Sequence, residues 1–299
     1  MARPKMIHQM TIPEFDRLFP DEEACCRYLV DRRWPDGVKC PRCGDGKVTE
    51  LKNNPWRWQC YACAPTTSYR FSHIAGTIFE NTNKPLRDWF RVLHMMVTSK
   101  KGVSALQVQR VMGFGSYATA WSMCHRIRAG MADEQFKQLV GYVEVDETFV
   151  GGKDRNKHKK DRGGKRGGKG KMIVAGAIQR GGNVVARVIE RADTLTLLDF
   201  VRTAVSHRVS LLSTDDYHPY RALDREYPHG SVRHSKGEYV VGALHTSTID
   251  SFWSMLKRGV MGTFHKVTKK YLPLYVAEFE FRYNNRENAD IFGAAIGTV

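Results

Sequence analysis

The sequence lacks any apolar stretch long enough to cross a bilayer, and no apolar signal-peptide core follows Met1. It is also poor in acidic residues: 31 Asp and Glu stand against 47 Lys and Arg, giving a formal net charge of +16 over 299 residues. The first absence argues against a membrane-embedded protein and favours a soluble, cytoplasmic one. The second favours a polyanionic partner, by default a nucleic acid, with a basic membrane-surface protein as the alternative.

The cysteines are not distributed as a disulfide framework would be. Four of the seven form two C-x-x-C pairs, Cys40 with Cys43 and Cys60 with Cys63, separated by sixteen residues. In a reducing compartment, two such pairs predict a tetrahedral structural Zn²⁺ site with a short hairpin between them. A redox dithiol is the alternative, but it needs only one pair, in a strand–helix context. We therefore expect a zinc ribbon over residues 36–80, stabilised by its metal.

Helical patterns flank this ribbon. An N-terminal helical segment, residues 1–35, contains a predicted helix at 11–30, and residues 81–135 contain predicted helices at 85–99, 104–111 and 116–131. The last two, joined by a glycine turn, form a helix-turn-helix pattern typical of DNA binding, with a plain helical hairpin as the alternative. Four residues of its second helix are predicted to contact DNA: Tyr117, Thr119, Arg126 and Arg128.

The stretch 141–152 mixes carboxylates into a strand-forming run of β-branched and aromatic residues. Because side chains alternate along a strand, Glu144, Asp146 and Thr148 share one face. A carboxylate on a buried strand is costly unless it is paired or binds a metal. Asp146 is therefore a candidate metal ligand, with Glu144 and Glu147 as backup ligands only. An edge strand with a solvated acidic face is the alternative.

A basic loop, residues 153–171, follows this strand. It is dense in Lys, Arg and Gly and has no apolar residue, so it cannot contribute to a core. Its position directly after the strand of Asp146 favours DNA phosphate binding over the alternative of a solvated charge run. The candidate phosphate contacts are Lys159, Lys160, Arg162, Lys165 and Arg166.

The remaining elements indicate the fold class. The sequence predicts a hairpin at 172–179 and 183–189, a helix at 193–205 and a buried strand at 209–213 that leads to Asp215. This order resembles an α/β ribonuclease-H-like domain, here over residues 136–299, in which carboxylates of the first and fourth strands meet. A later helix, 246–259, would place Asp250 and Lys257 on a related face, unless they are only a surface charge pair. Three such acids suit two Mg²⁺ or Mn²⁺ ions and phosphodiester chemistry.

Nearly the whole chain resembles the zinc-ribbon transposases of bacterial insertion sequences in the group numbered 1595, also called ISXO-two-like. The resemblance implies an acidic-triad (DDE-type) enzyme in which Asp146, Asp215 and Asp250 are the catalytic, Mg²⁺-binding acids, accompanied by Lys257. The third acid is usually Glu, one methylene longer than Asp250. The landmarks are residues 33–37, 76–79, 120–121, 125–128, 143–148, 151–152, 214–215, 245–246, 252–253, 256–259 and 281–286.

Membership of this group implies a DNA transposase. Such a protein would bind the terminal inverted repeats of its element, free a 3′-hydroxyl there and join it to target DNA, acting as a homo-oligomer at the nucleoid. Two rival hypotheses share most of these features. One is a catalytically inactive, domesticated zinc-ribbon regulator that only binds DNA. The other is a nuclease of the same fold, which would cut DNA without joining it.

Overall fold

The structure is a computed structural model that describes residues 10–63, 69–132, 136–151, 171–233, 236–238 and 240–297. It divides into a first unit, residues 1–131 with 287–299, and a second unit, residues 132–286. No helix within the described ranges combines the length and apolar composition needed to cross a bilayer. Five candidate phosphate contacts lie outside the described residues: Lys159, Lys160, Arg162, Lys165 and Arg166.

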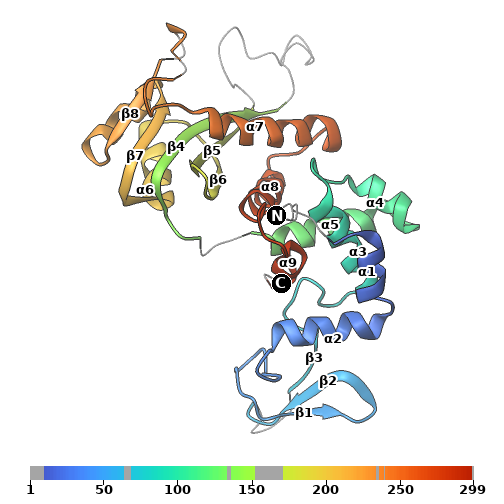
Figure 1. The fold of residues 1–299 in the computed structure, drawn as a ribbon. Coiled ribbons are helices and arrows are strands. Elements are labelled where there is room, and N and C mark those ends of the chain that lie inside the picture. Colours follow the sequence, from blue (N-terminus) through green and yellow to red (C-terminus); the bar gives the residue numbers. More distant parts are fainter. Residues whose placement is uncertain are drawn as a thin grey trace, which may run out of the picture. The chain divides into compact units, whose positions relative to one another are not determined.

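The first unit contains a small antiparallel sheet and six helices among its described residues (Figure 1). The sheet has the order β1-β2-β3, so the expected hairpin gains a third strand. The helices are α1 (Ile12–Leu18), α2 (Glu22–Arg33), α3 (Leu86–Thr98), α4 (Ala105–Met112), α5 (Tyr117–Gly130) and α9 (Ile291–Gly297). The strands are β1 (Val48–Leu51), β2 (Asn54–Cys60) and β3 (Tyr69–Ser72).

The prediction of a single helix at 11–30 is wrong, because the helix is interrupted between α1 and α2. The break falls at Phe19, which ends α1 in a non-helical conformation, and Pro20 follows directly. A residue before proline is disfavoured in the helical region. Asp21 then starts α2 by accepting a hydrogen bond from the Ala24 N–H at 2.8 Å. Two helices at an angle therefore replace one long helix.

Aromatic rings hold the first unit together, including its C-terminal helix. Phe292 of α9 lies 5.5 Å from the rings of both Phe19 and Phe90, between centroids. Phe15 and Tyr28 complete this cluster at 6.3 and 6.2 Å from Phe292. The sequence predicted that the catalytic domain runs to residue 299. In the structure, residues 287–299 belong to the first unit instead, because α9 fills a core made by the N-terminal helices.

The second unit is built on a five-stranded mixed sheet of order β6-β5-β4-β7-β8. The first three strands of this unit, β4, β5 and β6, are antiparallel neighbours. The strand β7 runs parallel to β4, and β8 runs parallel to β7. This is the predicted ribonuclease-H-like fold. Its strands are β4 (Leu139–Val150), β5 (Met172–Gln179), β6 (Val184–Ile189), β7 (Val205–Asp215) and β8 (His229–Val232). Its helices are α6 (Thr194–Ala204), η3 (His218–Arg225), α7 (Ser247–Gly259), η5 (Val260–Phe264) and α8 (Leu272–Asn284).

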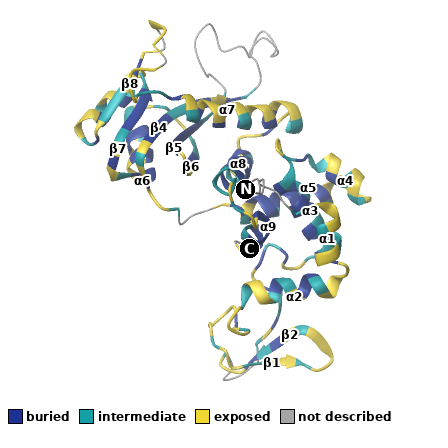
Figure 2. Cartoon of the chain, in the orientation of Figure 1, coloured by how far each residue is buried: buried dark blue, intermediate teal, exposed yellow. Residues whose placement is uncertain are grey.

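Helices cover both faces of this sheet. One core cluster joins the strands to α6 and η3, and a second joins them to α7 and α8. Val143 and Val145 of β4 belong to the first cluster, whereas Val150 belongs to the second. The even-numbered residues of β4, Asp146 among them, therefore face α7. In Figure 2 the buried positions are concentrated on the central strands, with exposed positions on the outer side of α7.

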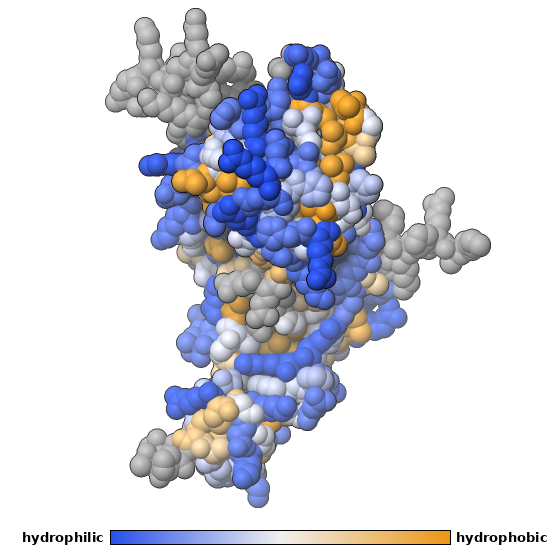
Figure 3. All heavy atoms as spheres, turned by 90° about the vertical axis from the view of Figure 1, so that its left-hand side faces the viewer, coloured by the Kyte–Doolittle hydropathy of each residue, from blue (hydrophilic) through white to orange (hydrophobic). Residues whose placement is uncertain are grey.

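Hydrophilic residues cover most of the surface visible in Figure 3, and the apolar areas among them are smaller. The exposed large apolar side chains belong to many different elements, from Ile12 of α1 to Leu195 of α6 and Met261 of η5.

Candidate active site and zinc centre

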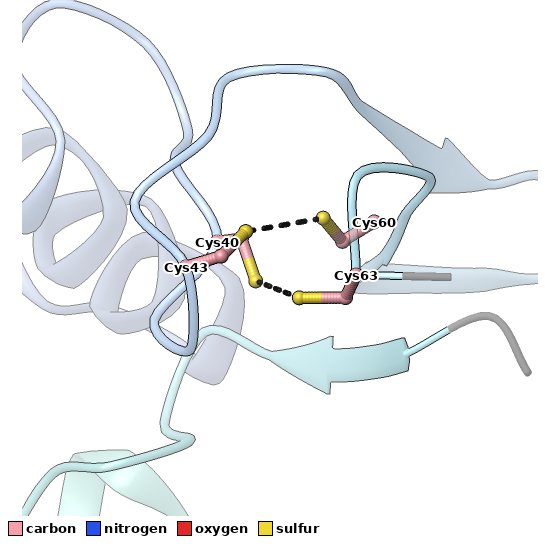
Figure 4. A group of neighbouring side chains, drawn as sticks. All are labelled: Cys40, Cys43, Cys60 and Cys63. Carbon is pink, nitrogen blue, oxygen red and sulfur yellow. Dashed lines mark hydrogen bonds between the residues drawn. The ribbon is translucent and has the colours of Figure 1, made fainter. Parts of the chain in front are cut away.

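The four ribbon cysteines converge on one point. Their Sγ atoms all lie within 4.8 Å of one another, with 3.6 Å between Cys40 and Cys63 and 3.7 Å between Cys43 and Cys60 (Figure 4). A tetrahedral zinc ion with Zn–S bonds of about 2.3 Å places its sulfur ligands about 3.8 Å apart. The residues present therefore fit Zn²⁺. Four protein ligands close the coordination sphere, which makes this a structural centre.

The thiols influence one another's ionisation. Burial acts to raise the pKa of Cys40, but hydrogen bonds from the backbone of Cys43 and Arg42 lower it to about 7. The neighbouring Cys43 thiol and burial together raise the pKa of Cys63 to about 12. Four adjacent thiols thus resist joint ionisation without a cation, which is the charge pattern of a site that needs a metal.

Asp146, on the face of β4 that α7 covers, lines a cleft in the second unit. Its Oδ2 accepts a hydrogen bond of 2.9 Å from the indole Nε1 of Trp253 on α7. Gly176 is the residue of β5 paired with Asp146, and a Cβ there would come within 2.6 Å of the Trp253 ring. Glycine at this position therefore lets the indole lie against the sheet, where it orients one oxygen of the carboxylate.

Burial, together with the negative charges of Glu147, Asp215 and Asp250, raises the pKa of Asp146 to about 7, although the hydrogen bond from Trp253 acts to lower it. Two of these neighbours are the other predicted triad acids. A carboxylate held among like charges is stabilised by a divalent cation, since the cation reverses the local charge balance. The electrostatics of the cleft therefore favour metal binding at Asp146.

This raised pKa predicts a pH effect on stability in metal-free buffer. The unfolded carboxyl has a pKa near 4, so between about pH 4 and 7 folded Asp146 keeps a proton that the unfolded chain has released. The free energy of unfolding should therefore fall as pH rises through this window, and the penalty should be complete above pH 7. From pH 5 to 8 we expect wild type to lose about 2–3 kcal/mol more than Asp146→Asn. Denaturant titrations in the presence of a chelator measure the free energy of unfolding of both proteins at each pH. Equal losses in wild type and Asp146→Asn would contradict the expectation.

Asp215 is brought beside Asp146 by the parallel pairing of β4 and β7. In that ladder Glu144 is the partner of Ser213. Two residues further along each strand, Asp146 and Asp215 reach the same level and the same face, on strands about 4.8 Å apart. The Oδ1 atom of Asp215 accepts the N–H of Tyr217 at 3.0 Å, which fixes the carboxylate at the strand end.

A chain of polar side chains, buried at Thr214 and exposed at Asp224, holds this strand end. The Thr214 hydroxyl donates to the carbonyl oxygen of Asp215 at 2.8 Å and lies 2.9 Å from Nε2 of His229 on β8. Nδ1 of His229 in turn lies 2.5 Å from Oδ1 of Asp224. No local pattern could have revealed this chain, because its members come from β7, η3 and β8.

The helix α7 has the two faces that its periodicity predicts. Phe252 and Leu256 are fully buried in the core. Asp250 and Lys257 are exposed and line a cleft of about 710 Å³, which also contains Asp146. The structure thus brings the first and third predicted acids and the predicted lysine to one cleft, whereas Asp215 is outside its lining and acts on Asp146 through charge.

Basic and aromatic side chains surround the acids in this cleft. Lys171, Lys257 and Arg258 place positive charge next to the carboxylates, an arrangement suited to a phosphodiester held beside a metal. Among the described residues, only the four cysteines form a group of three or more potential ligands within 4.8 Å, so the acids are spaced more widely. The cleft is lined by Asp146, Glu147, Thr148, Phe149, Lys171, Asp250, Trp253, Ser254, Lys257, Arg258 and Met261.

Glu147, one of the two expected backup ligands, points to the opposite side of β4 from Asp146. Its Oε2 accepts a 2.6 Å hydrogen bond from the hydroxyl of Tyr220, which is buried against the α6 side of the sheet. Burial raises the pKa of Glu147, and nearby Asp215 adds to this rise. Glu147 therefore contributes charge to the cleft while its carboxylate is held by Tyr220.

The two helices predicted on either side of a glycine turn are present as α4 and α5, with the turn at Gly113. Gly113 has φ 67°, a conformation that favours glycine and ends α4. Ser116 then caps α5 by accepting the Ala118 N–H at 3.2 Å. Tyr117 is exposed and Thr119 partly exposed in the first turn of α5, where a recognition helix contacts base edges.

The two arginines expected to contact DNA from α5 are placed differently. Arg128 is 1 % exposed, so its prediction as a DNA contact is wrong. It lies on the same side of α5 as the buried Cys124 and Ile127, in the half of the helix that packs into the interior. Arg126 is only partly exposed: its guanidinium donates to the Glu80 carbonyl at 2.6 Å and lies over the Trp89 ring.

Comparison with known proteins gives one consistent result. The sequence matches the family described as ISXO2-like transposase domain over residues 138–284 and the transposase zinc-ribbon domain over residues 20–66. It is 26% identical over 279 residues to an uncharacterized protein in transposable element ISH50 of Halobacterium salinarum, covering 89% of this chain and 92% of that protein. It is 31% identical over 101 residues to an uncharacterized transposase-like protein of Haemophilus influenzae, covering 33% of this chain and 80% of that one.

Among solved structures, the chain is similar to one in the cryoEM structure of the simian T-cell lymphotropic virus intasome in complex with PP2A regulatory subunit B56 gamma. The identity is 14%, the TM-score is 0.31, and the match covers 64% of this chain and 65% of that one.

Proposed function

Since the chain belongs to the ISXO2-like transposases of insertion sequences, we propose that it is a DDE-type DNA transposase, which cleaves the ends of its element and joins them to target DNA. The observation that carries this proposal is the set of three acids in the second unit. Asp146, Asp215 and Asp250 come from β4, β7 and α7, and the charges of the last two act on the first. Acids on separate elements of one sheet edge suit metal-dependent phosphodiester chemistry.

The proposed metal site consists of these three carboxylates. When bound, two Mg²⁺ or Mn²⁺ ions would activate the attacking oxygen and stabilise the leaving oxygen. The Trp253 indole, which donates a hydrogen bond to Oδ2 of Asp146, would hold this carboxylate in place for a metal. Lys257 and Arg258 would hold the phosphate on α7, and Lys171 would hold it beside β4.

The reaction consists of two phosphoryl transfers. In the first, water attacks the phosphate at the element end, the P–O bond to the element's 3′ oxygen breaks, and a 3′-hydroxyl is released. In the second, that hydroxyl attacks a phosphate of the target strand, and the target's own 3′ oxygen leaves. The number of phosphodiester bonds is unchanged in the second step, so it needs no energy source.

DNA recognition is assigned to the first unit and the basic loop. The zinc ribbon and the exposed start of α5, with Tyr117 and Thr119, would bind the terminal inverted repeats. The net charge of +16 supports binding to DNA phosphates, and the residues 153–171, which follow β4 in the sequence, contribute much of it. We propose that the protein acts as a homo-oligomer on paired ends and target DNA, at the nucleoid in the cytoplasm.

A strand-transfer assay tests this function. The substrate is the DNA that flanks the gene, with its candidate inverted repeats, incubated with the purified chain, Mg²⁺ or Mn²⁺ and a plasmid target. Joined products that require the terminal repeats are expected. Nicks without joining would instead support the nuclease of the same fold, and end-specific binding without nicks would support the inactive regulator.

Asp250→Glu should keep or raise strand transfer. The family usually has Glu here, and Asp250 is exposed at the cleft, so one more methylene has room. Asp250→Asn is the matched control and should lower joining by about 100-fold or more, because it removes a charge that binds the metal. A well-folded Asp250→Glu protein without activity would show that the site requires the shorter acid.

A further inference from the structure

Glu144 is the most deeply buried acid near the proposed site, with 0 % of its surface exposed. It lies on β4, two residues before Asp146 and on the same face. Its Oε2 accepts the backbone N–H groups of Thr248 at 2.8 Å and Ile249 at 3.0 Å. Its Oε1 accepts the Thr248 hydroxyl at 2.8 Å and Nε of Arg180 at 2.7 Å. Both oxygens are therefore engaged, which corrects the expectation that Glu144 is a backup metal ligand.

These bonds cap α7 from another element of the fold. Thr248 and Ile249 are the second and third residues of α7, and the first N–H groups of a helix have no partner within it. Thr246, at the N-cap position, makes no side-chain capping bond to them. A carboxylate also interacts favourably with the positive end of the helix dipole. Glu144 thus supplies the cap that the local sequence does not.

Arg180 extends this anchor to the segment before α7. Its Nη1 donates to the carbonyl of Ala243 at 2.7 Å and its Nη2 to that of His245 at 3.1 Å. The same guanidinium is paired with Glu144, so the segment and the helix start are held by one ion pair on the sheet. The start of α7 is therefore fixed relative to β4 in both position and direction.

We infer that Glu144 is a positioning residue for the third acid of the proposed transposase site, and this role rests on the proposed function. Asp250 follows Ile249 directly, so the bond to Ile249 sets where its side chain enters the cleft. One turn later, Trp253 bonds to Asp146. Two consecutive same-face residues of β4, Glu144 and Asp146, therefore hold two successive turns of α7, and this sets the rotation of the helix that presents Asp250 and Lys257.

A purely stabilising role explains this arrangement less well. Buried ion pairs contribute little net stability compared with apolar residues of similar size. What a carboxylate provides, and an apolar side chain does not, is a fixed set of acceptor directions for the N–H groups of α7. Those directions define the helix register over the sheet.

The test compares Glu144→Gln with a matched control, Glu280→Gln, in the full zinc-loaded chain. Glu280 is also a buried acid that ties a helix to the sheet. It lies on α8 and accepts the Ala186 N–H at 3.1 Å and Nη1 of Arg187 at 3.0 Å. None of the three proposed catalytic acids is on α8. The two variants therefore remove the same kind of bond, and only the first one loosens α7.

The first measurement is the Mn²⁺ concentration that gives half of the metal-induced rise in Tm. For Glu144→Gln this concentration should increase by about tenfold. That is the lower end of the loss in metal affinity that follows when a residue orienting a metal ligand is removed. Glu280→Gln should leave it at the wild-type value. The double variant Glu144→Gln, Asp250→Asn should have the same Mn²⁺ midpoint as Asp250→Asn alone, because both changes remove the contribution of Asp250 to metal binding.

The second measurement is amide hydrogen exchange at Thr248 and Ile249, which reports on the cap without metal or DNA. It should become faster in Glu144→Gln and stay unchanged in Glu280→Gln. If Glu144→Gln does not fold, Thr248→Val removes one donor of the same cap, and we expect an increase of about threefold in the Mn²⁺ midpoint.

An unchanged Mn²⁺ midpoint in Glu144→Gln, an equal shift in Glu280→Gln, or additive losses in the double variant would each overturn the positioning role. Failure of the proposed function has a different signature. In that case wild type joins no DNA, whereas the Mn²⁺ midpoints and amide exchange still separate Glu144→Gln from Glu280→Gln as expected.

Discussion

Asp146→Asn and Asp215→Asn are each expected to abolish end cleavage and strand joining while end binding is retained. Asparagine keeps the size of the side chain and one oxygen, but it removes the negative charge that a divalent cation requires. We expect a loss of more than about 1,000-fold, which corresponds to about 4 kcal/mol in the activation free energy. Binding to the terminal repeats should stay within about twofold, because the proposed end contacts lie in the first unit and the loop.

The strand-transfer assay and a gel-shift assay on the same preparations measure the two properties separately. Asp199→Asn is a suitable control, since Asp199 is exposed on α6, on the opposite side of the sheet from α7. It should join DNA at the wild-type rate. Normal joining by Asp146→Asn would remove Asp146 from the catalytic site and with it the proposed triad.

Loss of zinc is expected to unfold the ribbon. Structural zinc contributes on the order of 10 kcal/mol to the folding of small modules. The ribbon has only a small core of its own, in which the rings of Trp34, Trp58 and Phe71 pack against one another. In the double variant Cys40→Ser, Cys43→Ser, we expect the ribbon to lose protease resistance and the chain to lose end binding.

Metal analysis should find about one zinc per chain in wild type and less than about a tenth of that in the double variant. Cys26→Ala is the matched control. Cys26 is buried in α2, burial raises its pKa to about 12, and it is not among the four converging cysteines. It should therefore retain zinc. Wild-type protein without zinc would contradict the ribbon assignment.

Together the two predictions separate the two proposed activities of the chain. The acid variants should bind ends without chemistry, and the cysteine variant should lose end binding. The pH dependence attributed to Asp146 should persist in the cysteine variant, because that carboxylate belongs to the second unit. If the cysteine variant also lost this dependence, the two units would not fold independently.

The sequence predicted those features that depend on local patterns. Two C-x-x-C pairs identified the ribbon, because the spacing of thiolates around zinc is a local property. Alternation along β4 placed Asp146 and Glu144 on one face, and the helical period placed Asp250 opposite Phe252 on α7. The succession of elements indicated the fold class, but the short strand β8 was not predicted. One local signal that was missed is Pro20, which divides the N-terminal helix.

The sequence alone therefore determined the ribbon, the fold class and the candidate acids, each of which is recorded in neighbouring residues. The tertiary structure decided which side chains are buried and which residues contact them. The Glu144 carboxylate caps a helix 104 residues later in the chain, Arg128 is buried by its surroundings, and Phe292 packs against rings of the N-terminal helices. Local periodicity specifies the face on which a side chain lies, but the element that covers that face is chosen by the folding of distant segments.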